Sequence, residues 1–145
     1  MVAVVFLVYK RLLCVFSFFF IRCSKDFLKS YERRIVGTWR ITDVNRVGIG
    51  GNTDNLPFRQ GTFNFNNDGS LIYTNTSGDV YKGSWDIRKK WVDDKHVQSL
   101  QITAVDFVSQ NVLTEYYDDL NFTGTNRFKA KIISGSHTFV THFRR

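Results

Sequence analysis

From residue 35 to residue 145, apolar residues alternate with polar ones in short runs that are separated by turn residues. In Asn126–Ile133, for example, Phe128, Ala130 and Ile132 alternate with three basic residues. Successive side chains of a β-strand point to opposite faces, so this alternation predicts strands with one buried face. Turn sequences such as Asn67-Asp68-Gly69 favour tight hairpins between them. The pattern therefore predicts an all-β protein.

Eight such runs can be distinguished, and the tight turns between them predict an antiparallel meander. The expected strands are Ile35–Asp43, Gly61–Asn66, Ser70–Thr76, Val80–Arg88, Ser99–Asp106, Asn111–Tyr117, Asn126–Ile133 and His137–Arg144. Longer connections are expected at Val44–Gln60, Lys89–Gln98 and Asp118–Thr125. Because closure removes exposed strand edges, we expect an eight-stranded up-and-down β-barrel.

Large aromatic residues dominate the positions that should face the interior. The chain has fourteen Phe, six Tyr and three Trp. Those expected to point inward are Trp39, Phe63, Phe65, Tyr73, Tyr81, Trp85, Phe128, Phe139 and Phe143. An eight-stranded barrel is just wide enough for side chains or one small ligand, so we expect a largely filled interior. A narrow pocket would lie at the open end under the mobile loop Val44–Gln60, lined by Tyr73 and Trp85.

The first 23 residues indicate export. Lys10 and Arg11 precede the apolar run Leu12–Ile21, and the chain turns polar after Cys23. A basic patch, a short apolar run and a polar boundary are typical of a secretory signal peptide. Ten residues span about 15 Å as a helix, too little for a bilayer core of about 30 Å. We therefore expect a signal peptide at 1–22, a tether at 23–34 that forms one helical turn, and a domain at 35–145.

The boundary at Cys23 resembles a bacterial lipoprotein signal, in which the cysteine carries the lipid. This implies attachment to the bacterial envelope, most readily the outer membrane. One alternative is an uncleaved anchor over Val2–Ile21, with Lys10 and Arg11 reaching the interface. A translation start near Val8 is a further alternative.

Cysteine content and charge restrict the class of protein. Cys23 would be the only cysteine of the processed chain, so no internal disulfide is expected. That chain would have 17 basic and 13 acidic residues, a net charge of +4. This surplus suits solubility, or weak attraction to an anionic envelope, and does not indicate binding to nucleic acid. We expect a monomer.

The segment Gly37-Thr38-Trp39 on the first strand resembles the Gly-x-Trp signature of the lipocalins. The segments Phe63–Gly69 and Gly83-Ser84-Trp85 are similar to the F-x-x-x-G-x-W pattern of short lipocalin-like bacterial lipoproteins. In that family an arginine from the last strand packs across the tryptophan at the closed end of the barrel. Arg144 or Arg145 stands where the resemblance, which covers residues 35–145, implies that arginine.

Catalytic and metal-binding motifs are absent from the sequence. The three histidines are scattered, and no nucleophile elbow, phosphate loop or HExxH motif occurs. We expect no enzyme activity, no metal and no cofactor. A basic-aromatic cluster, Lys82, Arg88, Lys89, Lys90 and Trp91, is better explained as a solvated strand end than as a site for acidic glycans or lipid headgroups.

The prediction is thus an envelope-anchored, lipocalin-like binding protein for a small apolar or amphipathic ligand. The alternative is a structural or interaction lipoprotein with a filled barrel that binds a partner through its loops.

Overall fold

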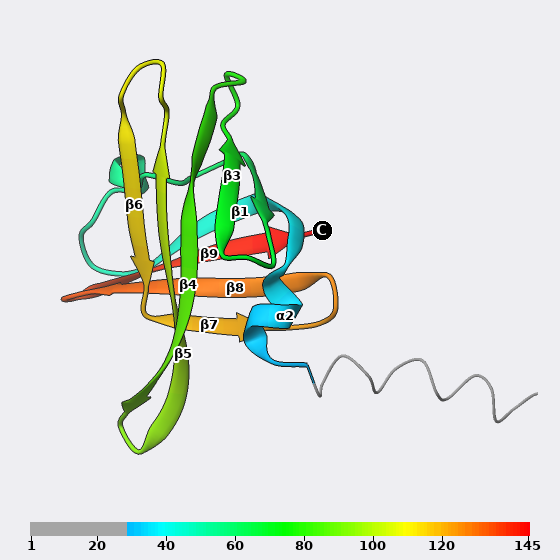
Figure 1. Cartoon of the computed structure of the whole chain (residues 1–145). Helices are drawn as coiled ribbons and strands as arrows, with labels where there is room; N and C mark the ends of the chain where they lie inside the picture. Colours follow the sequence, from blue (N-terminus) through cyan, green and yellow to red (C-terminus); the bar gives the residue numbers. More distant parts are fainter. Residues whose placement is uncertain (1–28) are drawn as a thin grey trace, which may run out of the picture. The chain divides into compact units, whose positions relative to one another are not determined.

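Nine antiparallel strands form one sheet in the computed structural model, which describes residues 29–145 (Figure 1). A short helix, α2 (Tyr31–Ile35), precedes the strands, and a 3-10 turn, η1 (Thr53–Asn55), interrupts the first connection. The strands are β1 (Gly37–Gly48), β2 (Thr62–Phe65), β3 (Ser70–Thr74), β4 (Val80–Val92), β5 (Lys95–Val105), β6 (Val112–Tyr117), β7 (Asp119–Phe122), β8 (Arg127–Ser134) and β9 (His137–Arg144). The prediction of an all-β antiparallel fold is confirmed.

The order of the strands is β6-β5-β4-β3-β2-β1-β9-β8-β7. Strands adjacent in sequence pair as hairpins, and the first strand pairs with the last from Arg40↔Arg144 to Gly48↔His137. The two edge strands, β6 and β7, do not pair with each other, so the sheet is not closed. Asp118 alone separates them in sequence. The chain therefore crosses from one edge of the sheet to the other within one residue.

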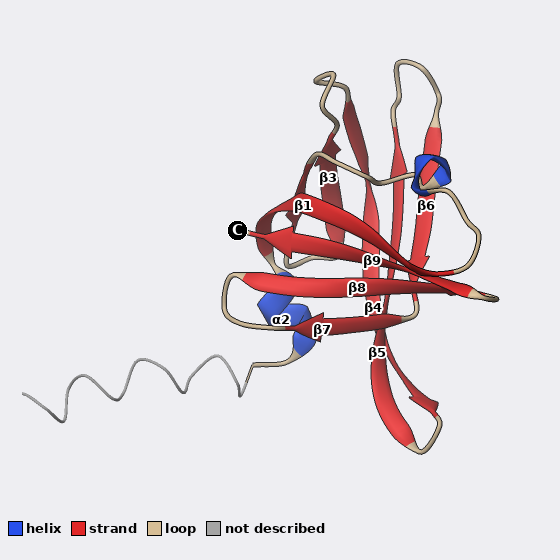
Figure 2. Ribbon diagram, turned by 180° about the vertical axis from the view of Figure 1, so that it is seen from behind, coloured by secondary structure: helices blue, strands red, loops and turns tan. Residues whose placement is uncertain are grey.

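The core lies where the sheet folds over on itself. The axes of β3, β4, β5 and β6 are roughly aligned with one another. The strands β1, β9, β8 and β7 form the other half of the sheet and cross them (Figures 1 and 2). The alternation predicted for β4, β5, β8 and β9 places their apolar residues between these two halves. All nine aromatic residues expected to face inward are buried.

The start of the domain differs from the prediction. Ile35 ends α2 instead of beginning a strand, and β1 continues to Gly48, well into the expected loop Val44–Gln60. The reason is a long-range pairing: after a register shift between Ile41 and Asp43, β1 follows β9 for the rest of its length. Local sequence carries no signal for a partner about 100 residues away.

Two further segments expected as connections contain strands. Lys89–Gln98 forms the outer part of the β4–β5 hairpin, with Lys89 paired to Gln98 and a tight turn at Asp93 and Asp94, whose φ values are 47° and 58°. Asp118–Thr125 contains β7, which pairs with β8 and buries Leu120. In both segments, cross-strand hydrogen bonds offset the low strand propensity of a polar, charged local sequence.

The predicted signal peptide, Cys23 and most of the tether lie outside the described residues. The helical turn expected in the tether corresponds to α2, which begins near the end of the predicted tether and finishes one residue after it. Within residues 29–145, no helix is both long and apolar enough to cross a membrane.

Candidate ligand-binding site

One end of the sheet is closed by Trp39, Arg145 and α2. The Trp39 side chain is fully buried, and its indole Nε1 donates a hydrogen bond to the carbonyl oxygen of Ile35 at 2.5 Å. The Arg145 guanidinium carbon lies 4.3 Å from the centre of the Trp39 ring. Arg145 also donates to the carbonyl oxygens of Arg34 and Val36. These contacts join the last residue of the chain to the segment that precedes β1.

Of the two arginines that the lipocalin resemblance singled out, Arg145 lies on the indole. Arg144 is the last residue of β9 and is exposed, at the register position opposite Arg40. Gly37 has a φ of 121°, and a Cβ added there would lie 3.5 Å from the Arg145 guanidinium. The glycine therefore provides a backbone conformation that other residues rarely adopt, directly beside the arginine.

Aromatic rings fill the centre of the domain. The Phe63 ring packs against Phe65, Tyr73 and Phe143, with centroid distances from 4.6 to 5.7 Å. Phe128 stacks on Phe143 at 4.2 Å. Interiors packed at this density leave little space for a ligand. We call the end of the sheet opposite α2 the open end.

The loop over the open end, residues 49–61, is anchored by Phe58. This side chain is buried, and its ring lies 5.4 Å from Phe63 and 4.9 Å from Tyr73. The sequence predicted a mobile loop over Val44–Gln60. Phe58 attaches this loop to the core at one position.

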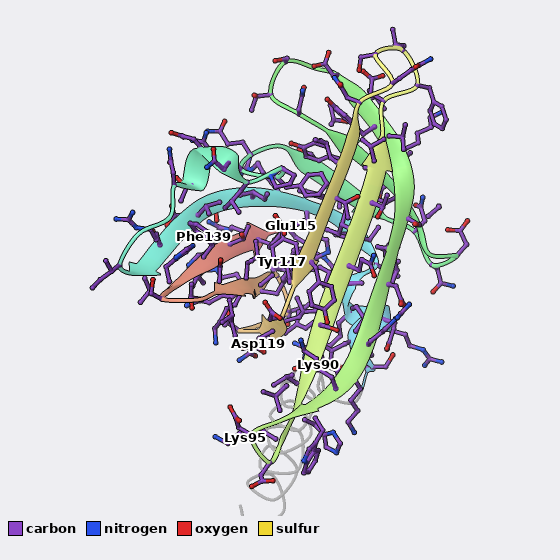
Figure 3. All side chains as sticks on the ribbon, turned by 90° about the vertical axis from the view of Figure 1, so that its left-hand side faces the viewer. Lys90, Lys95, Glu115, Tyr117, Asp119 and Phe139 are labelled. Atoms are coloured by element: carbon purple, nitrogen blue, oxygen red, sulfur yellow. The ribbon has the colours of Figure 1, made fainter. Side chains whose placement is uncertain are left out.

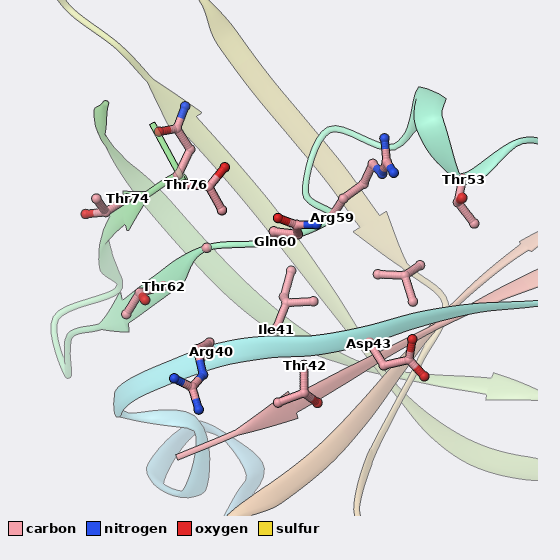
Figure 4. A pocket seen from close by; sticks show the side chains of 13 residues that line it. Arg40, Ile41, Thr42, Asp43, Thr53, Arg59, Gln60, Thr62, Thr74 and Thr76 are labelled. Atoms are coloured by element: carbon pink, nitrogen blue, oxygen red, sulfur yellow. The ribbon is translucent and has the colours of Figure 1, made fainter. Parts of the chain in front are cut away.

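Two hollows lie beside this loop. One, of about 370 Å³, is lined by Leu56, Pro57, Arg59, Tyr73, Tyr81 and Leu113, among others. The other, of about 570 Å³, lies between the loop and the shifted part of β1, and both polar side chains and the apolar Ile41 and Val44 line it (Figure 4). Arg59, Gln60, Asn75 and Thr76 line both hollows, so the two meet along these side chains.

The structure separates the two residues predicted to line a pocket. Tyr73 lines the smaller hollow, and its hydroxyl donates to the carbonyl oxygen of Gln60 at 2.7 Å. Burial, followed by the neighbouring Tyr81, raises the pKa of Tyr73 to about 12. Trp85 instead packs on Phe65 and donates to the carbonyl oxygen of Asn66 at 3.1 Å. It supports the core and does not line the hollow that Tyr73 lines.

Sequence reasoning missed three residues at the open end: Phe58, Leu113 and Glu115. Leu113 and Glu115 precede the buried Tyr117 at alternate positions of β6, so the period-two pattern already placed them on its inner face. Burial raises the pKa of the Glu115 carboxyl. Phe58 could have been suspected as the one aromatic side chain of residues 49–61.

Two of the four basic residues of the basic-aromatic cluster on the β4–β5 hairpin form ion pairs. Lys90 forms an ion pair with Asp118 at 3.2 Å, and Arg88 forms one with Asp86 at 2.6 Å. The exposed Trp91 packs its ring against His96 at 4.2 Å. Lys82 and Lys89 form no ion pair within residues 29–145, so half of the positive charge of the cluster is compensated.

Comparisons with known protein families, with curated proteins and with solved structures find no match for this chain. Within the described part of the chain, no group of three or more His, Cys, Asp and Glu side chains is placed to hold a metal ion.

Proposed function

We propose that this domain is a non-catalytic binding protein for a small apolar or amphipathic molecule held at the open end. The observation that carries the proposal is the hollow of about 370 Å³, in which Leu56, Pro57, Leu113 and the rings of Tyr73 and Tyr81 lie beside the polar side chains of Arg59, Gln60, Asn75 and Thr76. Small-molecule sites are concave and typically about 300–1,000 Å³, and they combine apolar side chains with polar groups that orient the ligand.

We propose further that the fold is a lipocalin-like barrel that is left open between its edge strands, β6 and β7. Two observations support this kinship. Arg145 covers Trp39 at the end opposite the hollow. The strands β6 and β7 are continuous through Asp118, and together they pair with β5 on one side and β8 on the other.

The proposed location is the bacterial envelope, with the domain attached through lipid on Cys23. The support is the basic, apolar and polar order of residues 10–26. Cys23→Ser should move the protein from the membrane fraction to the soluble fraction. A variant that still sediments with membranes would favour the uncleaved anchor instead.

The binding function can be tested by a thermal-shift screen with fatty acids, isoprenoids, haem-like pigments and short glycans. A ligand that binds the folded state raises the melting temperature by mass action. Leu113→Trp should fill the hollow and abolish the shift, whereas Val112→Trp, on the exposed face of the same strand, should retain it. Hits that survive Leu113→Trp would place the site elsewhere.

A second candidate is a structural or interaction lipoprotein with a filled interior. The β5–β6 turn favours it, since Phe107 and Val108 are 73% and 95% exposed. Asp106 stabilises this turn, because its carboxylate accepts hydrogen bonds from the Val108 amide and the Ser109 hydroxyl. In that case Phe107→Ser with Val108→Ser should abolish binding of a protein partner without changing the thermal shift by small molecules.

A further inference from the structure

A carboxylate faces the interior at the open end. Glu115 lies on β6 between Leu113, which lines the smaller hollow, and the fully buried Tyr117. Figure 3 shows Glu115 beside Tyr117, between β6 and the strand that carries Phe139. Glu115 is half-buried, and β6 is an edge strand of the sheet.

Within residues 29–145, Glu115 forms no ion pair. Its carboxylate accepts one hydrogen bond, from the Tyr116 amide at 3.0 Å, and the charged group that acts on it is another acid, Asp118. Two basic residues lie on facing strands toward the same end, but both are engaged elsewhere. Arg46 donates to a loop carbonyl oxygen at 2.6 Å, and the His137 ring packs on a phenylalanine at 5.0 Å.

Two buried hydroxyl groups near Glu115 also lack hydrogen-bond partners. The side chains of Tyr117 and Thr141 are fully buried, and neither hydroxyl forms a hydrogen bond in the described part of the chain. Thr141 lies close enough to influence the Tyr117 phenol, but the two groups do not reach hydrogen-bonding geometry. Burial, with the Glu115 charge next in importance, raises the pKa of Tyr117, which therefore stays protonated and able to donate.

Building on the proposed function, we propose that the ligand carries a protonated amine that pairs with Glu115 while its apolar body occupies the hollow beside Leu113. A partly buried carboxylate without a counter-ion is unfavourable, and an ammonium group supplies both the charge and the hydrogen bonds. The aromatic ring of Tyr117, two positions from Glu115 on the same face of β6, also favours a cation. An anionic ligand would instead be repelled by Glu115, and Arg59 is already paired with Asp54 at 2.6 Å.

Three water-soluble probes of similar size test this inference: 2-phenylethylamine, 3-phenylpropionate and 2-phenylethanol. Their affinities for the purified full-length chain would be measured by calorimetry at pH 7.5. We expect the amine to bind at least about tenfold more tightly than the other two, as charged hydrogen bonds allow. Glu115→Gln should remove this advantage, and the matched control Glu32→Gln, on the exposed face of α2, should keep it.

The pH dependence provides a second readout. Binding of the amine should weaken as the Glu115 carboxyl is protonated on acidification, and this dependence should be missing from Glu115→Gln. Equal or tighter binding of 3-phenylpropionate, or an amine affinity that Glu115→Gln leaves unchanged, would overturn the inference. If the probes bind without preference and Leu113→Trp blocks them, the proposed function stands and only the inference fails. If none of the three binds, both fail.

Discussion

The Arg145 guanidinium lies 4.3 Å from the centre of the buried Trp39 ring, which joins the last residue of the chain to its first strand. Arg145 also donates to the carbonyl oxygen of Val36, directly before β1. The indole is therefore enclosed by α2 on one side and by the C-terminus on the other. This end is closed by specific contacts, so the proposed ligand would have to exchange at the opposite end.

These contacts predict unequal roles for the two terminal arginines. Trp39→Ala should cost about 3–5 kcal/mol in the free energy of unfolding, as expected for a buried aromatic residue. Arg145→Ala should cost about 0.5–2 kcal/mol through loss of the cation–π contact. Arg144→Ala, at an exposed position, should change stability by less than about 0.5 kcal/mol. Urea denaturation measures all three, and an Arg144→Ala cost equal to that of Arg145→Ala would contradict the assignment.

Phe58 should contribute to the core although it belongs to a loop. Phe58→Ala removes contacts with Phe63 and Tyr73 and should cost about 3–5 kcal/mol. Ile49→Ala, at an 83% exposed position of the same loop, is the control and should be nearly neutral. If the two variants unfold at the same urea concentration, the loop is not anchored as described.

Gly83 on β4 is required by the close approach of β5. A Cβ added at this position would lie 1.8 Å from the carbonyl oxygen of Thr103 and 2.7 Å from the Cα of Ala104. Because both are backbone atoms that cannot move alone, Gly83→Ala should cost about 1–3 kcal/mol or prevent folding. An added Cβ at Gly124 meets no atom within 4 Å, so Gly124→Ala should be tolerated. Equal thermal stabilities of the two variants would argue against this register of β4 and β5.

Glu115 should destabilise the ligand-free protein at neutral pH. Burial raises the pKa of its carboxyl in the folded state, so between the unfolded and folded values the folded chain binds more protons. Stability therefore falls as the pH rises through this window, and it is regained on acidification. We expect Glu115→Gln to melt at a higher temperature than the wild type at pH 7, with the difference shrinking toward pH 4. A lower melting temperature at pH 7 would show that Glu115 has a favourable partner.

Local alternation predicted most of the strands and the inward aromatic residues. His137–Arg144 has the predicted bounds, and Trp39, Tyr73 and Phe128 are buried as expected. These features depend on side-chain periodicity and turn residues, which can be recognised within a short window of the sequence.

The features that define the open end depend on long-range contacts instead. The extension of β1 to Gly48 follows from its pairing with β9, and β7 exists because Leu120 packs and pairs beside β8. Likewise, the sequence contains no local signal that Phe58 reaches Phe63 and Tyr73. The hollow beside Leu113 results from these contacts, so its place could not be predicted from composition and periodicity.

The central claim is that the open end holds a small molecule, and native mass spectrometry of the protein purified from its own cells tests it most directly. The account predicts one additional small-molecule mass on the wild-type protein, absent from Leu113→Trp and present on Val112→Trp. A wild-type protein that carries no small molecule, or one whose bound mass is unaffected by Leu113→Trp, would contradict it.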